Sequence, residues 1–353
     1  MPSHLRLLPV ALLSLPLLSG CESLSYYSQS LGGHLELVNS GQRIDRLIAD
    51  PRSAPDLRAQ LTEARAIRAF ASERLALPDN NSYRSYVDTG REFVSWAVFA
   101  TPELSLEVRT WCFPIVGCVP YRGYFSRQEA FSYAKELADG GDDVYVAGIP
   151  AYSTLGWTSD PLLNTMFLRG DTYLASVVFH ELTHQVVYVR GDAAFNEAFA
   201  VSVEDSGTVL WLEHKDDKAG LKRYRLSQRR NADFQALVAR TREELHGIYT
   251  GNGSDAEKRA EKAAAIERLR ARYRRLKTRK WDGYSGYDAW FSEPINNAKL
   301  ATISVYNDLE PAFSRLLELC ASDYGRYYEA VRRIGRLDFA RRREVLEGAT
   351  RCD

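Results

Sequence analysis

The sequence His180-Glu181-Leu182-Thr183-His184 lies within an apolar stretch, residues 172–190, whose pattern predicts a helix that stops at Gly191. Four residues make slightly more than one helical turn, so both imidazoles would project from the same face and could bind one metal ion. Glu181 would lie about 100° further round the helix, beside the ion but not bound to it. The motif therefore predicts a metal site with Glu181 as its catalytic base.

A third protein ligand is needed, because a catalytic zinc site keeps three protein ligands and leaves one position for water. The sequence Asn196-Glu197-Ala198-Phe199-Ala200 follows a glycine break and opens a second predicted helix, residues 193–214. We therefore predict that Glu197 is the third ligand of one Zn2+ per chain, since two imidazoles and a carboxylate suit zinc. Glu204 and Asp205, on the same helix, are either rival ligands or partners that orient the histidines.

The predicted histidine helix is otherwise apolar, and burying His, Glu and His within it would be costly without a metal. The alternative is that the motif arose by chance and that its polar residues are hydrogen-bonded in the core. The helical placement and the following N-E-x-x-A sequence favour the metal site. The apolar residues that surround the motif are Leu174, Val177, Val178, Phe179, Leu182, Val186 and Val187.

The N-terminus predicts an exported protein. Residues 7–18 are apolar but too short for an ordinary membrane-spanning helix, which is typical of a secretory signal. They end in Leu18-Ser19-Gly20-Cys21, which resembles a bacterial lipobox. We therefore predict a lipoprotein signal peptide at residues 1–20. The alternative is an ordinary signal peptide followed by a chance cysteine.

Cys21 would then be acylated and become the first residue of a mature chain, residues 21–353. Its lipid would anchor an otherwise soluble protein to the membrane. The localisation predicted is the bacterial cell envelope, with the protein facing the periplasm. Glu22, in place of aspartate, favours the outer membrane over the inner one.

Four further cysteines remain, Cys112, Cys118, Cys320 and Cys352. An even number in an exported protein indicates disulfides. We predict pairing of neighbours, Cys112 with Cys118 and Cys320 with Cys352, among three connectivities. A zinc site made from these cysteines is the rival interpretation, and the lack of a C-x-x-C pair disfavours it.

The remaining pattern predicts an α+β fold that is predominantly helical, with a small sheet near the metal helix and a single catalytic domain. Residues 22–40 form a short segment broken at Gly32-Gly33, and residues 111–121 are expected to be irregular. Strands are predicted at residues 94–98, 104–108 and 144–148. Further helices are predicted at residues 39–77 (interrupted by prolines), 126–139, 221–246, 255–280, 294–319 and 324–349.

The helices at 221–246 and 255–280 predict an antiparallel helical hairpin, about residues 221–280. Its basic runs, such as residues 268–275, are more typical of a solvated face than of a nucleic-acid site. Lys and Arg total 46, as do Asp and Glu, so the formal net charge is zero. We therefore predict no nucleic-acid partner. A protein partner that docks on the hairpin is an open alternative.

The H-E-x-x-H and N-E-x-x-A motifs resemble those of the gluzincin metallopeptidases, which include thermolysin and zinc aminopeptidases, although the motifs are closer together here. Nearly the whole mature chain is similar to a family of bacterial lipoproteins described as predicted aminopeptidases. The similarity rests on residues 112–125, the two motifs, and residues 296–300 and 306–309. It implies a gluzincin-like core, zinc, a peptide substrate and aminopeptidase activity.

In the peptidase hypothesis, Glu181 takes a proton from the attacking water and passes it to the leaving amine. Gluzincins generally stabilise the oxyanion with a downstream Tyr or His, so the resemblance suggests Tyr306, whose alternative role is that of a core aromatic. Residues 144–148 could offer a sheet edge to the peptide, or be a plain core strand. The alternative function is a non-catalytic metal-binding or scaffold lipoprotein. A glutamate base beside the ligands disfavours it, because structural zinc sites are closed by four protein ligands.

Overall fold

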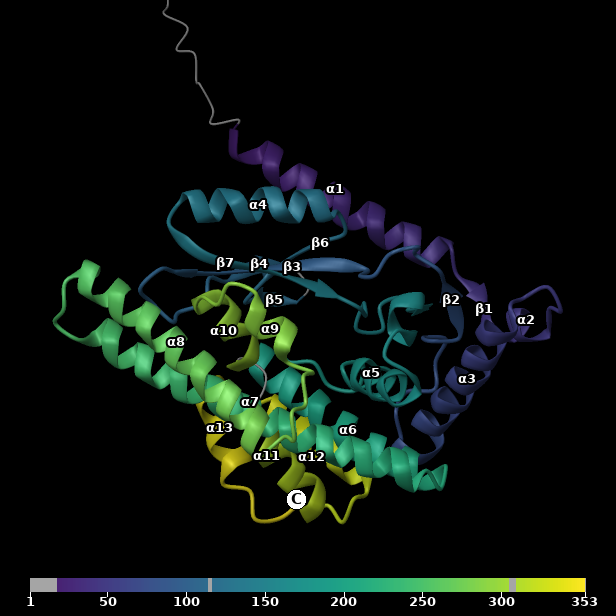
Figure 1. The fold of residues 1–353 in the computed structure, drawn as a ribbon. Coiled ribbons are helices and arrows are strands. Elements are labelled where there is room, and N and C mark those ends of the chain that lie inside the picture. The colour runs from purple at the N-terminus through teal and green to yellow at the C-terminus, as the bar shows by residue number, and fades with distance from the viewer. Residues whose placement is uncertain (1–17, 114–115, 305–308, 353) are drawn as a thin grey trace, which may run out of the picture.

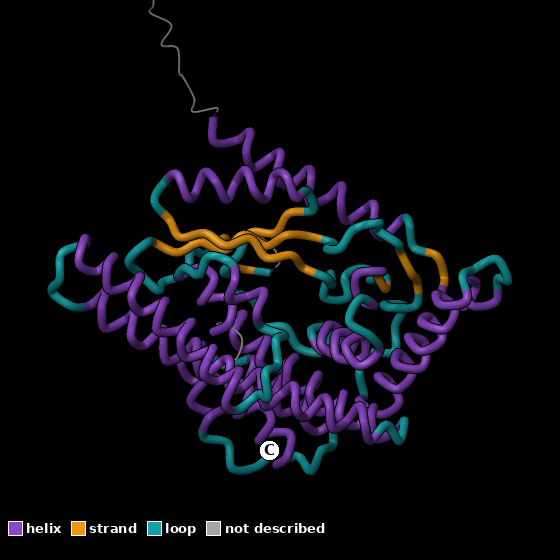
Figure 2. Tube along the Cα trace, in the orientation of Figure 1, coloured by secondary structure: helices purple, strands orange, loops and turns teal. Residues whose placement is uncertain are grey.

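The computed structural model describes residues 18–113, 116–304 and 309–352. Over these residues the fold is α+β and predominantly helical, which confirms the predicted class (Figures 1 and 2). The helices are α1 (Leu18–Asn39), α2 (Ile44–Ala49), α3 (Pro55–Leu75), α4 (Arg127–Asp139), α5 (Asp171–Thr183), α6 (Ala193–His214), α7 (Lys218–Thr250), α8 (Asp255–Arg279), α9 (Asp288–Ser292), α10 (Asn297–Ser304), α11 (Glu310–Leu319), α12 (Tyr324–Gly335) and α13 (Phe339–Glu347). The strands are β1 (Gln42–Arg43), β2 (Ser85–Val87), β3 (Ser95–Pro102), β4 (Trp111–Phe113), β5 (Gly117–Val119), β6 (Arg122–Tyr124), β7 (Asp142–Ile149) and β8 (Leu162–Leu163).

The main sheet has the order β6-β3-β7 and is antiparallel throughout. Alternation along β3 gives it two apolar faces. Trp96 and Val98 pack with Ala130 of α4, whereas Ala97 and Phe99 pack with Ala298 of α10. Helices α1 and α4 therefore cover one face, and the helical body lies beneath the other (Figure 1).

The largest core lies in the helical body, where α5 and α6 pack side by side against α3 and α11. Their contact faces are fully buried and aromatic. Phe199 of α6 lies 5.7 Å from Phe313 of α11 between ring centroids, and Phe179 of α5 lies 6.0 Å from Phe70 of α3. Burial on several sides fixes both helices, and these are the helices that carry the two sequence motifs.

Helices α7 and α8 form a hairpin whose far end extends beyond the body at the left of Figure 1. Ser254 and Glu257 form a capping box that starts α8. The inner side packs on α9, where Tyr273 stacks on Phe291. Of the basic run, Arg268 and Arg272 pair with Glu244.

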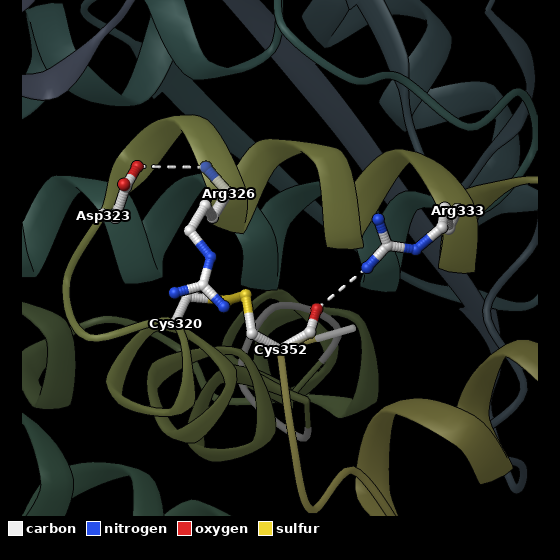
Figure 3. Close-up of a disulfide and its surroundings, with 5 residues drawn as sticks. All are labelled: Cys320, Asp323, Arg326, Arg333 and Cys352. Atoms are coloured by element: carbon white, nitrogen blue, oxygen red, sulfur yellow. Dashed lines mark hydrogen bonds between the residues drawn. A yellow bond between two sulfur atoms is a disulfide. The ribbon is translucent and has the colours of Figure 1, made fainter.

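The two disulfides join neighbours along the chain, Cys112 with Cys118 and Cys320 with Cys352. The first closes the two-stranded ribbon β4–β5, where the two cysteines face each other in register. The second ties the end of α11 to the C-terminal segment, and Arg333 of α12 donates a hydrogen bond to the Cys352 carbonyl at 2.9 Å (Figure 3). Asp323 caps α12 by accepting from the Arg326 N–H (Figure 3).

Four local predictions outside the metal centre were wrong. Residues 324–349 form two helices, α12 and α13, and not one, because α12 ends at Gly335 and Asp338 caps the start of a new helix. Residues 104–108 are a turn and loop, not a strand. The side-chain amide of Asn297 donates hydrogen bonds to the carbonyls of Glu103 and Ser105, which a strand would use for pairing. Part of the segment 111–121 is the ribbon β4–β5, not irregular chain, since the disulfide holds its two strands together.

The fourth error concerns α1, which runs without a break through Gly32-Gly33. Gly33 lies directly against the ring of Phe125, where no side chain would fit, so this glycine serves close packing and does not end the helix. Among the described residues, no helix is both long enough and apolar enough to span a membrane.

Candidate metal centre

Helix α5 presents both histidines of the H-E-x-x-H motif toward one point. His180 lies in its last turn, and His184 is its C-cap residue. Their Nε2 atoms are 3.1 Å apart, and their ring centroids are 4.8 Å apart. The four-residue spacing has therefore placed the two imidazoles together, as helical geometry requires.

Glu197, in the first turns of α6, completes the group. Its Oε2 is 3.3 Å from Nε2 of His180, and its Oε1 is 3.8 Å from Nε2 of His184. The ligand atoms of these three residues all lie within 4.8 Å of one another. Two imidazole nitrogens and one carboxylate are donors that a divalent cation such as zinc prefers.

A tight loop between the two helices brings Glu197 back to the histidines. The side-chain amide of Asn196 donates to the carbonyl of Val189 at 2.8 Å and accepts from its N–H at 2.7 Å. Asp192 caps α6 through the Phe195 N–H and forms a buried ion pair with Arg342 of α13. Both contacts belong to the N-terminal end of α6, so the first residue of the N-E pair has a structural role that the sequence reasoning missed.

The histidine helix is shorter than the sequence suggested. Helix α5 ends at Thr183, and residues 184–192 form turns and loop, although their apolar composition had predicted helix as far as residue 190. The hydrogen bonds from Val186 N–H to the Thr183 carbonyl and from Asn196 to Val189 replace the helical ladder. This early stop lets two closely spaced motifs face each other.

The structure separates the roles of Glu204 and Asp205. Glu204 Oε2 lies 2.9 Å from Nδ1 of His180, so its carboxylate orients that imidazole. Asp205 points elsewhere and accepts hydrogen bonds from Tyr224, at 2.7 Å, and from Gln228 of α7. Glu204 therefore contacts the ligand group, whereas Asp205 connects α6 to the hairpin.

The hydrogen bond between Glu204 and His180 also indicates whether a cation fits between the three proposed ligands. A carboxylate accepts hydrogen bonds, so Nδ1 of His180 carries a proton, and Nε2 then turns toward the Glu197 carboxylate. A lone pair on this Nε2 would face carboxylate oxygens at 3.3 Å unless a proton or a cation lies between them. The residues present therefore fit a divalent cation, which would replace that proton.

The charges of the group perturb its pKa values in opposite directions. Burial lowers the pKa of His180, but the carboxylates of Glu197 and Glu204 outweigh it and hold that pKa well above its usual value. Burial lowers the pKa of His184 to about 4, so its imidazole is neutral at pH 7 and free to act as a ligand. Burial would raise the pKa of Glu197, but the two histidines keep it below its ordinary value.

Glu181 lies in an environment that disfavours its charged form. Burial raises its pKa to about 7, against the lowering effect of His180 and with further raising by Glu197 and Asp160. A carboxyl group with a pKa near the working pH can both take and return a proton. This is the property that a general base at this position needs.

Two tyrosines near the group were not identified from the sequence. Tyr121 lies in the turn between β5 and β6, and Tyr188 follows α5. Burial and then the nearby charge of Glu197 raise the pKa of each phenol. Tyr121 lies within the cysteine-containing stretch that carried the family resemblance, which is the signal that could have found it. Tyr306, the tyrosine proposed from the sequence, lies outside the described residues.

The disulfide ribbon positions Tyr121. Gly117 has φ +80°, and a Cβ built there would lie 2.7 Å from the Gly191 nitrogen. The Gly191 N–H donates to the Val116 carbonyl at 3.1 Å. The ribbon therefore packs by backbone contact on the loop that joins the two metal helices.

The sequence at residues 296–300 has a structural role. The Asn296 amide donates to the Val144 carbonyl of β7 at 2.9 Å. Lys299 is fully buried and donates to Glu293 at 2.7 Å and to the Trp290 carbonyl. Asn296 therefore holds the start of α10 against β7, which is an edge strand of the described sheet, whereas Lys299 fixes α10 to the end of α9.

A comparison with protein-family models matched residues 25–346 to the family described as "Putative aminopeptidase". Comparisons with curated proteins and with solved structures found no match. The matched region contains the ribbon, α5, α6 and the hairpin, and it spans nearly all of the 353 residues. On this match, the chain belongs to the family described as "Putative aminopeptidase".

Proposed function

We propose that the chain is a zinc-dependent peptidase, and an aminopeptidase in its mode of action. The observation that carries the proposal is the convergence of His180, His184 and Glu197, whose ligand atoms lie within 4.8 Å of one another. The charges of His180 and Glu197 act on the neighbouring Glu181. These three residues would hold Zn2+. When bound, zinc would polarise the scissile carbonyl and acidify a water molecule. The aminopeptidase mode rests on the family match.

The protein's own residues supply the proton transfers. Glu181, with a pKa of about 7, takes a proton from the attacking water and delivers it to the leaving amine. Glu204 holds His180 in one orientation through Nδ1. Because His184 is buried, its imidazole stays neutral at pH 7.

The oxyanion needs a further donor, and the hydroxyls of Tyr121 and Tyr188 are placed near Glu197. Replacing the donor by Phe should lower kcat and leave the zinc content unchanged. If kcat is unchanged in both single variants and in the double variant, these tyrosines are excluded and Tyr306 becomes the next candidate.

The decisive experiment compares wild type with Glu181→Gln. Zinc content is measured by elemental mass spectrometry, and cleavage is measured on a peptide library. We expect the variant to keep its zinc and to lose about 10²–10⁴-fold in kcat. Glu136→Gln, at an exposed site on α4, is the matched control and should behave as wild type. Equal cleavage by Glu181→Gln and wild type would remove the catalytic role.

The products decide the mode of action. Loss of single residues from the N-terminus of library peptides, seen as mass differences, would support an aminopeptidase. Internal fragments would contradict that mode while leaving the zinc peptidase intact. Retained zinc with no cleavage of any peptide by wild type would favour a non-catalytic metal-binding protein.

We also propose that Cys21 is lipidated and that the protein faces the periplasm, with the outer membrane favoured by Glu22. The sequence Leu18-Ser19-Gly20-Cys21 supports this. Incorporation of labelled palmitate should occur in wild type and disappear in Cys21→Ser. Labelling that persists in the variant would exclude this site.

A further inference from the structure

Helix α1 has an inner face that fixes it to the sheet. Tyr26 lies 5.4 Å from Tyr124 between ring centroids, and the Gln29 side chain accepts from the Phe125 N–H at 2.9 Å. Further along, Leu37 is buried in the main core. These contacts, spread over three turns, set which side of α1 points away from the protein.

The outer face of α1 carries three apolar side chains at four-residue intervals. Tyr27, Leu31 and Leu35 are 48%, 60% and 47% exposed, and we call them the outer stripe. Residues four apart lie above one another on a helix, so the stripe is continuous. Exposing such a row to water is unfavourable and indicates a surface that meets something apolar.

A neighbouring helix extends the apolar surface. Helices α1 and α4 lie together on the same face of the main sheet, at the top of Figure 1. On α4, Phe131 is 45% exposed, and the Arg127 guanidinium lies 4.6 Å from its ring centroid. The only lysine of α4, Lys135, is paired with Asp139 at 2.5 Å.

We propose that the outer stripe, together with Phe131, docks on the surface of a zwitterionic lipid bilayer, with α1 lying along that surface. Amphipathic helices bind in this way, with their apolar side chains at the boundary between headgroups and acyl chains. Tyrosine favours the same depth, because its ring is apolar and its hydroxyl is polar. The stripe is thus a second membrane contact, distinct from a lipid on Cys21.

The position of the stripe along the chain favours a bilayer over a protein partner. Cys21, the residue proposed to carry the lipid, lies in the first turn of α1. At 1.5 Å per residue, the stripe begins about 9 Å and ends about 21 Å from Cys21 along the helix. A lipid at Cys21 would therefore hold the stripe at the membrane surface. This inference uses the proposed lipidation, and it does not depend on the peptidase activity.

The charges explain why the lipid should be zwitterionic. Residues 26–39 contain no Lys or Arg, and Glu36 is their only acidic residue. The stripe itself therefore offers no Lys or Arg to anionic headgroups, and on α4 the Arg127 guanidinium lies over the Phe131 ring. Binding should therefore be insensitive to salt and to the addition of anionic lipid.

Docking on this face would also orient the metal centre. The main sheet lies between α1 and α10 (Figure 1). Tyr121, whose pKa the charge of Glu197 helps to raise, packs with the face that meets α10. The metal centre therefore lies on the side of the sheet away from the proposed membrane surface. Peptides would reach it from the aqueous side.

The test uses a spin label at the stripe of the full-length protein. Leu31→Cys is labelled with a nitroxide and reconstituted in phosphatidylcholine vesicles, with and without anionic lipid. Collision rates with oxygen, which concentrates in lipid, and with a water-soluble nickel complex are measured by electron paramagnetic resonance. Leu226→Cys, at a 39% exposed position on α7, is the matched control. Unsubstituted protein gives the background from Cys21.

We expect the oxygen-to-nickel ratio to be several-fold higher at residue 31 than at residue 226, with or without anionic lipid. Adding Tyr27→Ser and Leu35→Ser to Leu31→Cys should reduce this ratio toward the control value. The formation of both disulfides and an unchanged Tm would show that this variant folds.

Any other outcome of the collision and vesicle measurements overturns the proposal. High accessibility to both reagents would place the stripe in water, and failure of the protein to associate with vesicles would exclude docking. Protection from both reagents would mean that a protein covers the stripe. Immersion only with anionic lipid would mean that charge, and not the apolar stripe, drives contact. If labelling of Cys21 with palmitate fails while immersion persists, the lipid anchor is refuted and the docking surface stands.

Discussion

The carboxylate of Glu204 decides which nitrogen of His180 faces the ligand group. It accepts the Nδ1–H at 2.9 Å and so directs Nε2 toward Glu197 and His184. Mutation of residues that orient a metal-binding histidine in this way typically costs about 10–100-fold in metal affinity. Glu204 is therefore part of the candidate site, although it is not one of the three proposed ligands.

Removing the charge of Glu204 should weaken metal binding. We expect Glu204→Gln to lower zinc affinity about 10–100-fold, since the amide orients Nδ1–H less strongly. Competition with a chromophoric chelator measures the affinity. Glu213→Gln, at a 48% exposed side chain on the same helix, is the control. Equal affinities of Glu204→Gln and wild type would show that the contact contributes nothing to metal binding.

Titration of Asp205 should make the free energy of unfolding depend on pH. Burial and then the adjacent Glu204 charge raise its pKa to about 7, against the hydrogen bonds from Tyr224 and Gln228. Between about pH 4 and pH 7 the folded chain keeps a proton that the unfolded chain has released, so stability contributed by Asp205 falls as pH rises. We expect Asp205→Asn to gain stability relative to wild type from pH 4.5 to pH 7.5 in urea unfolding. A difference that does not change with pH would contradict this.

At the scale of elements, the β4–β5 ribbon is attached to the loop between the metal helices through glycine. A Cβ at Gly117 would lie 2.7 Å from the Gly191 nitrogen, and its φ of +80° disfavours other residues. The position of the ribbon therefore determines the position of Tyr121, which lies four residues after Gly117. Any change that lifts the ribbon should also move that tyrosine.

Gly117→Ala should reduce activity as well as stability. The left-handed backbone alone costs about 1–2 kcal/mol, and the contact with Gly191 adds to it. Gly141→Ala is a matched control, because Gly141 has φ +93° with no heavy atom within 4 Å of a built Cβ. We expect kcat/KM to fall for Gly117→Ala and not for Gly141→Ala. Equal kcat/KM values for the two variants would show that the position of the ribbon does not affect the candidate site.

Local patterns in the sequence predict the parts of this molecule that depend on local geometry. The relative placement of His180 and His184 follows from helical spacing alone, and the helical character follows from periodicity. The end of α5 at Thr183 does not follow, because Asn196 of the next helix replaces its hydrogen bonds. The position of Tyr121 beside Glu197 depends on residues far apart in the chain, which no local pattern encodes.

At the scale of the whole molecule, the proposed zinc ion would connect α5 and α6, two helices that pack against each other in the largest core. A ligand that binds only the folded state stabilises it by about 2.7 kcal/mol at a concentration 100-fold above its Kd. Stability and metal occupancy should therefore be linked. This link offers a measurement that does not require a known substrate.

Removal of the metal should lower Tm. We expect a chelator to lower the Tm of wild type and zinc to restore it, as measured by circular dichroism. Glu197→Gln, which lacks one of the three proposed ligands, should show a Tm that responds much less to either treatment. A wild-type Tm that is the same in chelator and in zinc would argue against a bound ion at this site.

The buried ion pair between Asp192 and Arg342 joins residues 150 positions apart. Asp192 begins the helix that carries Glu197, so this end of the proposed zinc site is supported by a side chain that is synthesised 150 residues later. A nascent polypeptide lacks that support until Arg342 has left the ribosome. Full assembly of the candidate metal centre would thus wait until synthesis has passed Arg342.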